Sequence, residues 1–396
     1  MTEISPQYLE RIRDNKRVRQ RLAFEDPFWF CLLYLRHHFK YSFAPFHLEM
    51  FHLIRQTEHD FMAIMAFRES GKSTILNMAN ILWSILGKPK KNFVLIMSQT
   101  QEQAKNHFSN IKHELETNEL LREDFGPFTE HEGTWNKLSL ELEYHGSKIM
   151  SLIRDQSIRG LKYNQHRPDL IICDDLEDAA SVNDESQRQT LDRWFQSEII
   201  PLGNEKTRIV VLGNLLSHFL DDPETDRSFI LRLRNEILQG KIKGIFRAYP
   251  LIDDYGKNLW PGRFPDHESV RKLRSKMSRK TWILEYLLKS YGQKNDEGPN
   301  VSFYNPNITH EDWIRKGFRD FGYTVPDAGE MSHLKPQTAL IEQMNDYVIR
   351  VPTHTMAFFP RPDDPRYLAY LKDMHFYQND SDLEKRIAMD IKKTDG

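Results

Sequence analysis

Short continuous runs of apolar residues, each followed by polar side chains, recur along the N-terminal part of the chain. They predict strands at residues 61–66, 93–97, 170–173 and 208–212, and runs without alternation are expected of strands buried on both faces of a parallel sheet. Helical patterns follow these strands, and the first one ends at Gly87. Alternating strands and helices predict an α/β fold, with a mostly parallel central sheet flanked by helices and right-handed crossovers.

The first strand runs into a Gly-Lys-Ser-Thr turn that opens a helix, which is the arrangement of a phosphate-binding loop. In such a P-loop, Gly71 lets the main chain approach the phosphates, Lys72 neutralises them, and Ser73 holds Mg²⁺. Ala66 stands where the usual pattern has its first glycine, so a chance Gly-Lys-Ser at a helix start is the alternative. The residues expected to bind the nucleotide are Glu69, Ser70, Gly71, Lys72, Ser73 and Thr74.

Acidic residues follow the strand at 170–173, in the sequence RPDLIICDDLED. Ligands of open α/β sheets bind at the carboxyl ends of the strands, so these carboxylates are expected beside the phosphate loop. Asp174 would hold Mg²⁺, usually through water, and the next acidic group would polarise the attacking water. Asp175 occupies the usual position for that group and Glu177 has the longer reach, so both stay open. The alternative is a strand followed by an acidic helix cap.

Two further segments complete the predicted sheet. The strand at 208–212 ends at Gly213 and Asn214, where the Asn214 side chain could sense the γ-phosphate. The segment KLSLELEYHGSKIMSLIRD alternates apolar and polar residues about His145-Gly146, which predicts an antiparallel hairpin. Such an extra hairpin fits a larger P-loop ATPase better than a small kinase.

Together these motifs resemble the ATPase domain of the phage terminase large subunit, over about residues 25–292. The resemblance rests on FRESGKST, SIRGLKYNQHRPDLIICDDLED, VVLGN and LWPGRFP. In that family the loop often lacks its first glycine and has an Arg four residues before the Lys, as Arg68 is here. The resemblance implies that Arg68 is an arginine finger in cis or couples hydrolysis to motion, and that Gly213 and Asn214 form a coupling motif.

The resemblance also implies the wider function. The chain is expected to be an Mg-ATP-dependent motor that packages double-stranded DNA into capsids, as a homo-oligomeric ring. The implied partners are a portal protein and a small terminase subunit, in the host cytoplasm. Other P-loop ATPases, helicase-like or defensive, and a non-catalytic nucleotide-binding scaffold stay open as alternatives.

The segment FAPFHLEMFHLIRQ, before the loop, resembles the part of this family that contacts adenine. Phe46 and His47 are the residues that would stack on the base or bond to it. An amphipathic helix that packs Phe46, Met50 and Leu53 into the core is the alternative, and both interpretations can hold together.

The charge of the chain is nearly balanced, with a net charge of -2 and a pI of about 6.8, so any contact with DNA must come from local patches. The densest basic runs are residues 11–21 and 268–280, and each predicts a helix that binds phosphates without reading sequence. A solvated helix face is the alternative for both runs. Arg159, beside Gly160, is another candidate contact to DNA or to a neighbouring subunit.

The last hundred residues lack the pattern of the nuclease that follows the ATPase in full-length large terminases. A Gly/Pro/Asn-rich boundary lies around residues 293–308, and the best strand candidate, at 346–351, ends in Pro352 and Thr353. The acids of this part occur in polar, turn-like sequence, which is more typical of a solvated loop than of a metal site, namely Asp363, Asp364, Asp380, Asp382 and Glu384. We therefore predict no nuclease here, and a separate nuclease polypeptide. The predicted segments are an N-terminal helical segment at 1–45, the ATPase core at 46–250, a basic lid or linker at 251–292 and a small appendage at 293–396.

Other features of the sequence indicate an ordinary intracellular protein. Cys31 and Cys173 are the only cysteines and are interpreted as buried small hydrophobic residues. No apolar run is long enough to span a bilayer, so no membrane contact is expected. His37 and His38 have no partner at metal-ligand spacing in the sequence, and are interpreted as ordinary histidines.

Overall fold

The computed structural model describes residues 6–56, 59–128, 138–154, 156, 158–216, 227–253 and 258–289. They fall into two compact units. The first holds the described residues of Met1–Asp60 and Gly71–Leu212, and the second holds Phe61–Ser70 with those from Gly213 onward. The segment boundaries expected from the sequence stay predictions, and the expected appendage at 293–396, with its missing nuclease, lies outside the described residues.

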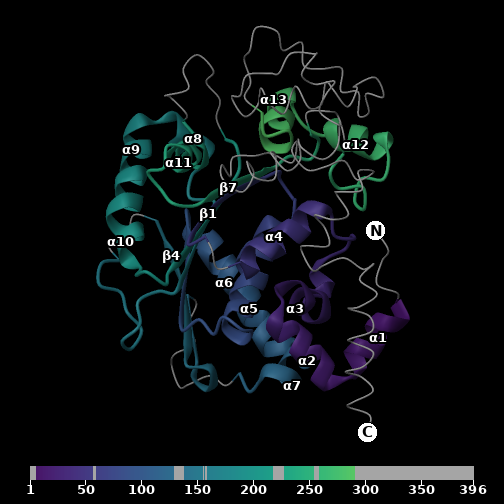
Figure 1. The fold of residues 1–396 in the computed structure, drawn as a ribbon. Coiled ribbons are helices and arrows are strands. Elements are labelled where there is room, and N and C mark those ends of the chain that lie inside the picture. The colour runs from purple at the N-terminus through teal and green to yellow at the C-terminus, as the bar shows by residue number, and fades with distance from the viewer. Residues whose placement is uncertain are drawn as a thin grey trace, which may run out of the picture. The chain divides into compact units, whose positions relative to one another are not determined.

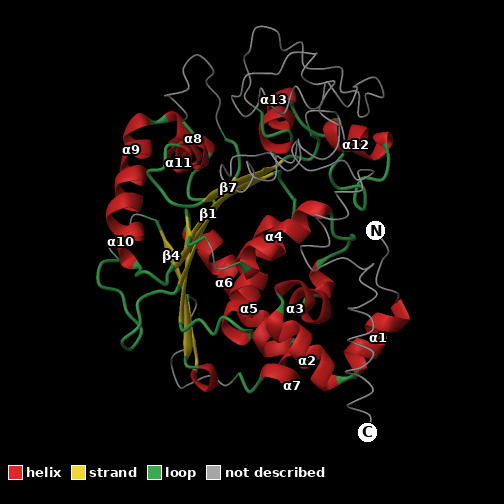
Figure 2. Cartoon of the chain, in the orientation of Figure 1, coloured by secondary structure: helices red, strands yellow, loops and turns green. Residues whose placement is uncertain are grey.

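Seven strands form a mostly parallel sheet in the order β3-β4-β2-β5-β6-β1-β7. Figure 2 draws the strands in yellow and the helices in red. Their bounds are β1 Phe61–Ala66, β2 Phe93–Ser98, β3 Ser139–Leu142, β4 Ser147–Ile153, β5 Leu170–Asp174, β6 Arg208–Gly213 and β7 Ile245–Tyr249. The predicted α/β fold and its predicted strands are confirmed. Strand β7 is the one strand among the described residues that the sequence pattern did not predict.

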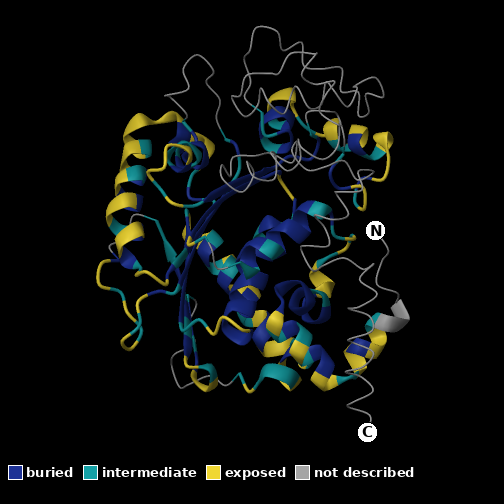
Figure 3. Cartoon of the chain, in the orientation of Figure 1, coloured by how far each residue is buried: buried dark blue, intermediate teal, exposed yellow. Residues whose placement is uncertain are grey.

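Strands β2, β4, β5 and β6 of the first unit pair in parallel, while β3 and β4 form the predicted antiparallel hairpin. Gly146 takes a left-handed conformation at the hairpin turn, with φ 60°. The register places Ser98 beside Asp174, and Asp174 beside Leu212, at the carboxyl ends of their strands. Every residue of β2 and β5 is buried, as expected of strands with a continuous apolar sequence. Figure 3 shows the centre of the sheet in the dark blue of buried residues.

Helices cover both faces of the sheet in the first unit, with α9 and α10 on one face and α3 to α6 on the other (Figure 1). The helices are α1 Pro6–Asp14, α2 Lys16–Glu25, α3 Pro27–Tyr34, α4 Pro45–Arg55, α5 Asn80–Leu86, α6 Gln101–Thr117, α7 Glu119–Phe125, α8 Ala179–Asn183, α9 Glu185–Trp194 and α10 Ile200–Leu202. Two single turns of 3-10 helix are η1 Arg36–His38 and η3 Glu143–His145, and two π-helical segments are η2 Thr74–Ala79 and η4 Phe195–Ile199. Segment η2 continues directly into α5, whose C-cap is Gly87, the residue predicted to end this helix. Cys31 and Cys173 are fully buried, also as expected.

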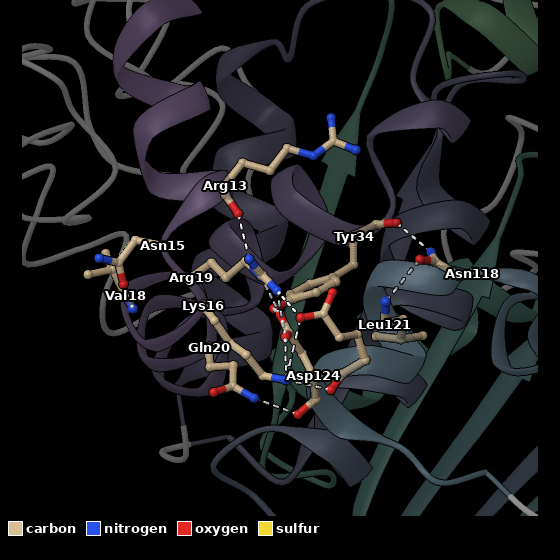
Figure 4. A network of polar contacts seen from close by, with 11 residues as sticks. Arg13, Asn15, Lys16, Val18, Arg19, Gln20, Tyr34, Asn118, Leu121 and Asp124 are labelled. Carbon is tan, nitrogen blue, oxygen red and sulfur yellow. Dashed lines mark hydrogen bonds and ion pairs between the residues drawn. The ribbon is translucent and has the colours of Figure 1, made fainter. Parts of the chain in front are cut away.

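A buried polar network joins helix α2 to helix α7 (Figure 4). The Arg19 guanidinium donates to both carboxylate oxygens of Asp124, at 2.6 and 2.8 Å. The Tyr34 hydroxyl donates to the same carboxylate at 2.6 Å, and burial together with this bond raises the pKa of Tyr34. Arg19 is therefore a structural residue, and it is not available for the DNA contact predicted for the run 11–21. That run is also two helices, because Asn15 caps the start of α2.

The second unit is built on the parallel pair β1 and β7. Helix α11 (Phe229–Leu238) contacts both strands, and α12 (His267–Arg274), α13 (Arg279–Thr281) and η6 (Trp282–Tyr286) follow. The predicted single helix over 268–280 is wrong, because α12 ends at Arg274 and Ser278 caps α13. Its basic residues are all exposed, namely Arg271, Lys272, Arg274, Lys276, Arg279 and Lys280. In the described part of the chain, no helix has the length and apolar character needed to cross a bilayer.

Candidate nucleotide site

The phosphate loop follows β1 and contains unusual backbone conformations. Glu69 has φ 63° and Gly71 has φ 86°, both in the left-handed region. A non-glycine residue there costs roughly 1–3 kcal/mol, so the surrounding structure must hold Glu69 in place. The helix begins at once after the loop, because the Ile75 N–H donates to the Gly71 carbonyl at 3.0 Å. The loop therefore ends at a helix N-terminus, which is where backbone N–H groups can bind an anion.

Side chains from the start of this helix meet the carboxylates at the end of β5, within the first unit. The Lys72 ammonium lies 3.7 Å from Asp175 Oδ1, and Ser73 Oγ lies 3.4 Å from Asp174 Oδ1. The Lys72 and Asp174 side chains are buried, at 8% and 1% exposed, while that of Asp175 is 37% exposed. The structure thus brings together the loop and the acidic pair, which are about a hundred residues apart in the sequence.

Asp175 combines a strained backbone conformation with a carboxyl whose pKa is shifted. Its backbone is left-handed, with φ 48°, and its N–H donates to the Leu212 carbonyl of β6 at 3.1 Å. Burial raises the pKa of the Asp175 carboxyl, Lys72 opposes this shift, and the neighbouring charge of Asp174 adds to it. A strained acidic residue beside a buried lysine is a frequent feature of catalytic sites.

Two residues that the sequence did not single out also contact Asp174. Asn77 Nδ2, one helical turn beyond Ser73, donates to Asp174 Oδ2 at 3.1 Å. His107 Nε2, on α6, lies 3.5 Å from the same oxygen. Asn77 could have been found from its spacing, because i and i+4 share a helix face. Nothing in the local sequence marks His107, whose approach depends on how α6 packs.

The residues around Asp174 fit a magnesium ion. Mg²⁺ prefers oxygen ligands, and the Ser73 hydroxyl and Asp174 carboxylate offer them from two elements. Two buried oxygens, Asn77 Oδ1 and Ser98 Oγ, have no hydrogen-bond partner among the described residues. Such orphaned polar atoms are rare in native structures, and ordered waters around a bound ion would satisfy them.

The other predicted acids and basic residues differ in their surroundings. Asp178 caps α8, accepting from the Ala180 and Ser181 N–H groups at 3.0 and 2.7 Å, so the alternative of an acidic helix cap holds for this residue. Glu177 is half-buried, and its part in polarising water stays a prediction beside that of Asp175. Arg159 is exposed and pairs with Glu198 at 2.7 Å.

Arg68 and Glu69, in the second unit, are both engaged by residues far along the chain. The Arg68 guanidinium pairs with Glu285 at 2.8 Å, and its N–H donates to the Glu285 carbonyl at 2.9 Å. Arg263 donates to both the carbonyl and the carboxylate of Glu69. The Arg68 side chain is nevertheless 60% exposed, so it can leave its partner at small cost. Asn214, also in this unit, is half-buried after β6.

The residues expected to contact adenine lie on α4. Phe46, Met50 and Leu53 are buried, which confirms the packing interpretation of this helix. His47 is also buried, and its Nδ1 accepts from the Ala44 N–H at 2.8 Å. Its Nε2 lies beside the phosphate loop, since a Cβ added to Gly71 would meet it at 3.6 Å. Contact with the base stays a prediction for Phe46 and His47. Of the remaining loop residues, Ser70 is buried and Thr74 is half-buried.

No protein-family model matches the chain, and no curated protein matches it. Among solved structures it is similar to the HK97 bacteriophage large terminase, with 16% identity and a TM-score of 0.43 over 63% of this chain and 51% of that one. It is also similar to a Thermus phage large terminase ATPase domain, with 14% identity and a TM-score of 0.40 over 64% of this chain and 96% of that one.

A third similar structure is a large terminase from a thermophilic bacteriophage, with 9% identity and a TM-score of 0.40 over 62% of this chain and 53% of that one. The chain spans about half the length of the HK97 terminase. These neighbours are phage large terminases, the family that the sequence motifs resemble. Because the identities are low, we base the function on the geometry of the site.

Proposed function

We propose that the chain is a P-loop ATPase that hydrolyses Mg-ATP to move double-stranded DNA, in the manner of a terminase packaging motor. One observation carries the ATPase part. Lys72 and Ser73, at a helix N-terminus, lie 3.7 and 3.4 Å from Asp175 and Asp174, at the end of the central strand β5. This pairing of a phosphate-binding lysine with a carboxylate pair is the arrangement that phosphoryl transfer requires.

The residues of the chain take distinct parts in the proposed reaction. Lys72 leaves Asp175 and neutralises the negative charge that develops on the transferred phosphoryl group. Asp175 or Glu177 then orients and polarises the attacking water. Mg²⁺, held by Ser73 and Asp174, supplies further neutralisation of the phosphate oxygens when it is bound. Asn77 and His107 keep the Asp174 carboxylate in position. The part of Arg68 as an arginine finger in cis stays a prediction from the motif resemblance.

The DNA part of the proposal draws on a different surface. The exposed basic residues from Arg271 to Lys280 come from two short helices and the turn between them, and all of them can contact phosphates without reading sequence. The resemblance of the motifs to large terminases supports a ring of subunits that works with a portal protein, a small terminase subunit and a separate nuclease in the host cytoplasm. DNA binding of this kind weakens steeply with salt.

ATP turnover with and without linear double-stranded DNA tests the proposal. The wild type should hydrolyse ATP, and DNA should stimulate it. Lys72→Ala should abolish turnover, whereas Lys88→Ala should not, since Lys88 forms an exposed surface pair with Glu25. Equal turnover in wild type and Lys72→Ala would refute the ATPase, and absent turnover in both would favour a nucleotide-binding scaffold.

Two further assays separate the remaining alternatives. DNA-strand displacement that depends on ATP would favour a helicase-like enzyme over a translocase. A supercoiled-plasmid nicking assay with Mn²⁺ tests the predicted lack of a nuclease. Nicking that vanishes when Asp363 or Asp380 is replaced would overturn that prediction.

A further inference from the structure

Two adjacent histidines and a distant glutamate form a compact cluster in the first unit. His37 Nε2 and His38 Nε2 lie 2.9 and 2.8 Å from the same oxygen, Glu114 Oε1. The three ligand atoms all lie within 4.8 Å of one another. Glu114 is on α6 and the histidines form most of η1, so the cluster joins segments 76 residues apart. The sequence indicated no partner for these histidines at metal-ligand spacing, and the fold brings Glu114 to them. Their interpretation as ordinary histidines stays a prediction.

The spacing of the cluster is close to that of a metal site. Zinc bonds to histidine nitrogen and carboxylate oxygen are about 2.0–2.1 Å, so neighbouring ligand atoms in a tetrahedral site lie about 3.3 Å apart. The two nitrogen–oxygen distances need to open by only a few tenths of an ångström to reach this value. The two histidine nitrogens and the Glu114 oxygen therefore lie close to the separations of a metal site without an ion bound.

Other contacts fix the cluster in this geometry. The Glu114 side chain is 3% exposed, and its second oxygen, Oε2, accepts from Asn118 Nδ2 at 2.8 Å. Asn118 also donates to the Tyr34 carbonyl at 2.7 Å and caps α7 through Leu121. Metal-binding carboxylates are commonly held by such outer hydrogen bonds, which set their orientation.

The electrostatics also favour a cation. A buried carboxylate needs a positive partner, and a divalent ion supplies more charge than two imidazole N–H groups. The His37 side chain is 56% exposed and that of His38 is 30% exposed, so an ion can enter from solvent.

From these observations we propose that His37, His38 and Glu114 bind a divalent transition-metal ion of the zinc class, with water completing the coordination. Two imidazoles and one carboxylate suit Zn²⁺ and disfavour Mg²⁺, which prefers oxygen ligands alone. The ion would cross-link η1 to α6 and stabilise the attachment of the N-terminal helices. The site shares no residue with the proposed nucleotide site, and it does not depend on the proposed function.

Competition with a chromophoric chelator measures Zn²⁺ binding to the full chain. The wild type should bind one Zn²⁺ tightly, and millimolar Mg²⁺ should not displace it. His37→Gln should weaken binding by at least roughly 100-fold, because it removes a direct ligand. This exposed residue is the safest of the three to replace, and His38→Gln should give the same loss. Zn²⁺ should also raise the melting temperature of the wild type and not of either variant.

Two control variants make the outcome decisive. His113→Gln replaces an exposed histidine on the same helix, next to Glu114 but outside the cluster, and should bind Zn²⁺ like the wild type. Asp174→Asn removes a proposed Mg²⁺ ligand and should also leave Zn²⁺ binding unchanged. Undiminished binding in His37→Gln, or an equal loss in His113→Gln, would overturn the proposal.

Discussion

The adjacent acids Glu123 and Asp124 offer a sharp test of how burial controls an ion pair. Both pair with Arg19, but the Asp124 side chain is 0% exposed and that of Glu123 is 56% exposed. Asp124→Ala removes the two hydrogen bonds that the buried Arg19 side chain, 5% exposed, donates to Asp124, and leaves those to Glu123 and to the Arg13 carbonyl. It also removes the acceptor of the Tyr34 hydroxyl. Breaking a buried pair from one side costs about 3–5 kcal/mol, whereas an exposed pair contributes about 0–1 kcal/mol.

Urea unfolding, followed by tryptophan fluorescence, measures the difference between these variants. Asp124→Ala should lower the free energy of unfolding by about 3–5 kcal/mol, and Glu123→Ala by less than about 1 kcal/mol. Glu123→Ala is the matched control, since it removes a neighbouring charge that shares the same arginine. Similar losses in both variants would refute the conclusion that the buried network, rather than charge alone, attaches α2 to α7.

Three other predictions concern single residues. Gly71→Ala should lower the free energy of unfolding by about 1–2 kcal/mol, because φ is 86° and an alanine is strained in this left-handed conformation. The added Cβ would make only an ordinary van der Waals contact, so no steric cost is added, and an unchanged urea midpoint would contradict this prediction. The Arg208 guanidinium donates to four backbone carbonyls, which a lysine ammonium with three donors cannot all satisfy. Arg208→Lys should therefore lower the free energy of unfolding by roughly 3 kcal/mol in the same assay, and a loss below about 1 kcal/mol would contradict this prediction. The N–H of Ser181 lowers the pKa of Asp178, so the cap stabilises the fold above the ordinary pKa of 3.8 and is lost as pH falls. As the pH falls, the free energy of unfolding should therefore decrease less in Asp178→Asn than in the wild type. The same dependence of stability on pH in both proteins would contradict this prediction.

The sequence was most informative where function and fold depend on a local pattern. Strand β5 is a fully buried apolar run that ends in acids, and β1 runs directly into the Gly-Lys-Ser turn. Each of these patterns specifies its own element, and the parallel topology then places their carboxyl ends at one edge. For this reason the meeting of Lys72 with the acidic pair could be predicted from the sequence.

Contacts that depend on packing between distant segments could not be predicted in this way. His107 on α6 approaches Asp174 at the end of β5, and His38 reaches Glu114 across 76 residues. No local pattern marks either partner. Strand β7 was missed for a different reason, because Arg247 interrupts its apolar run although the residue is buried in the fold.

The basic runs show how capping overrides a helical pattern. Asn15 accepts from the Val18 N–H at 3.1 Å, and Ser278 accepts from the Thr281 N–H at 3.1 Å. Each of these caps starts a new helix within a basic run that was predicted from its charges to be a single helix. Charge density indicates where cations lie along the chain, and the fold decides which of them, unlike Arg19, reach solvent.

Ser73 and Asp174 are proposed to hold one Mg²⁺ on a bound nucleotide, and a double-mutant cycle of these two residues is the decisive test. Calorimetric titration would compare ATP binding to the wild type, Ser73→Ala, Asp174→Asn and the double variant, with Mg²⁺ and again with EDTA. The coupling energy between the two substitutions should be at least about 1 kcal/mol with Mg²⁺ and almost zero with EDTA. The EDTA measurement is the control for the direct contact between the two side chains, which does not need the metal. Additive losses under both conditions would contradict a shared metal site.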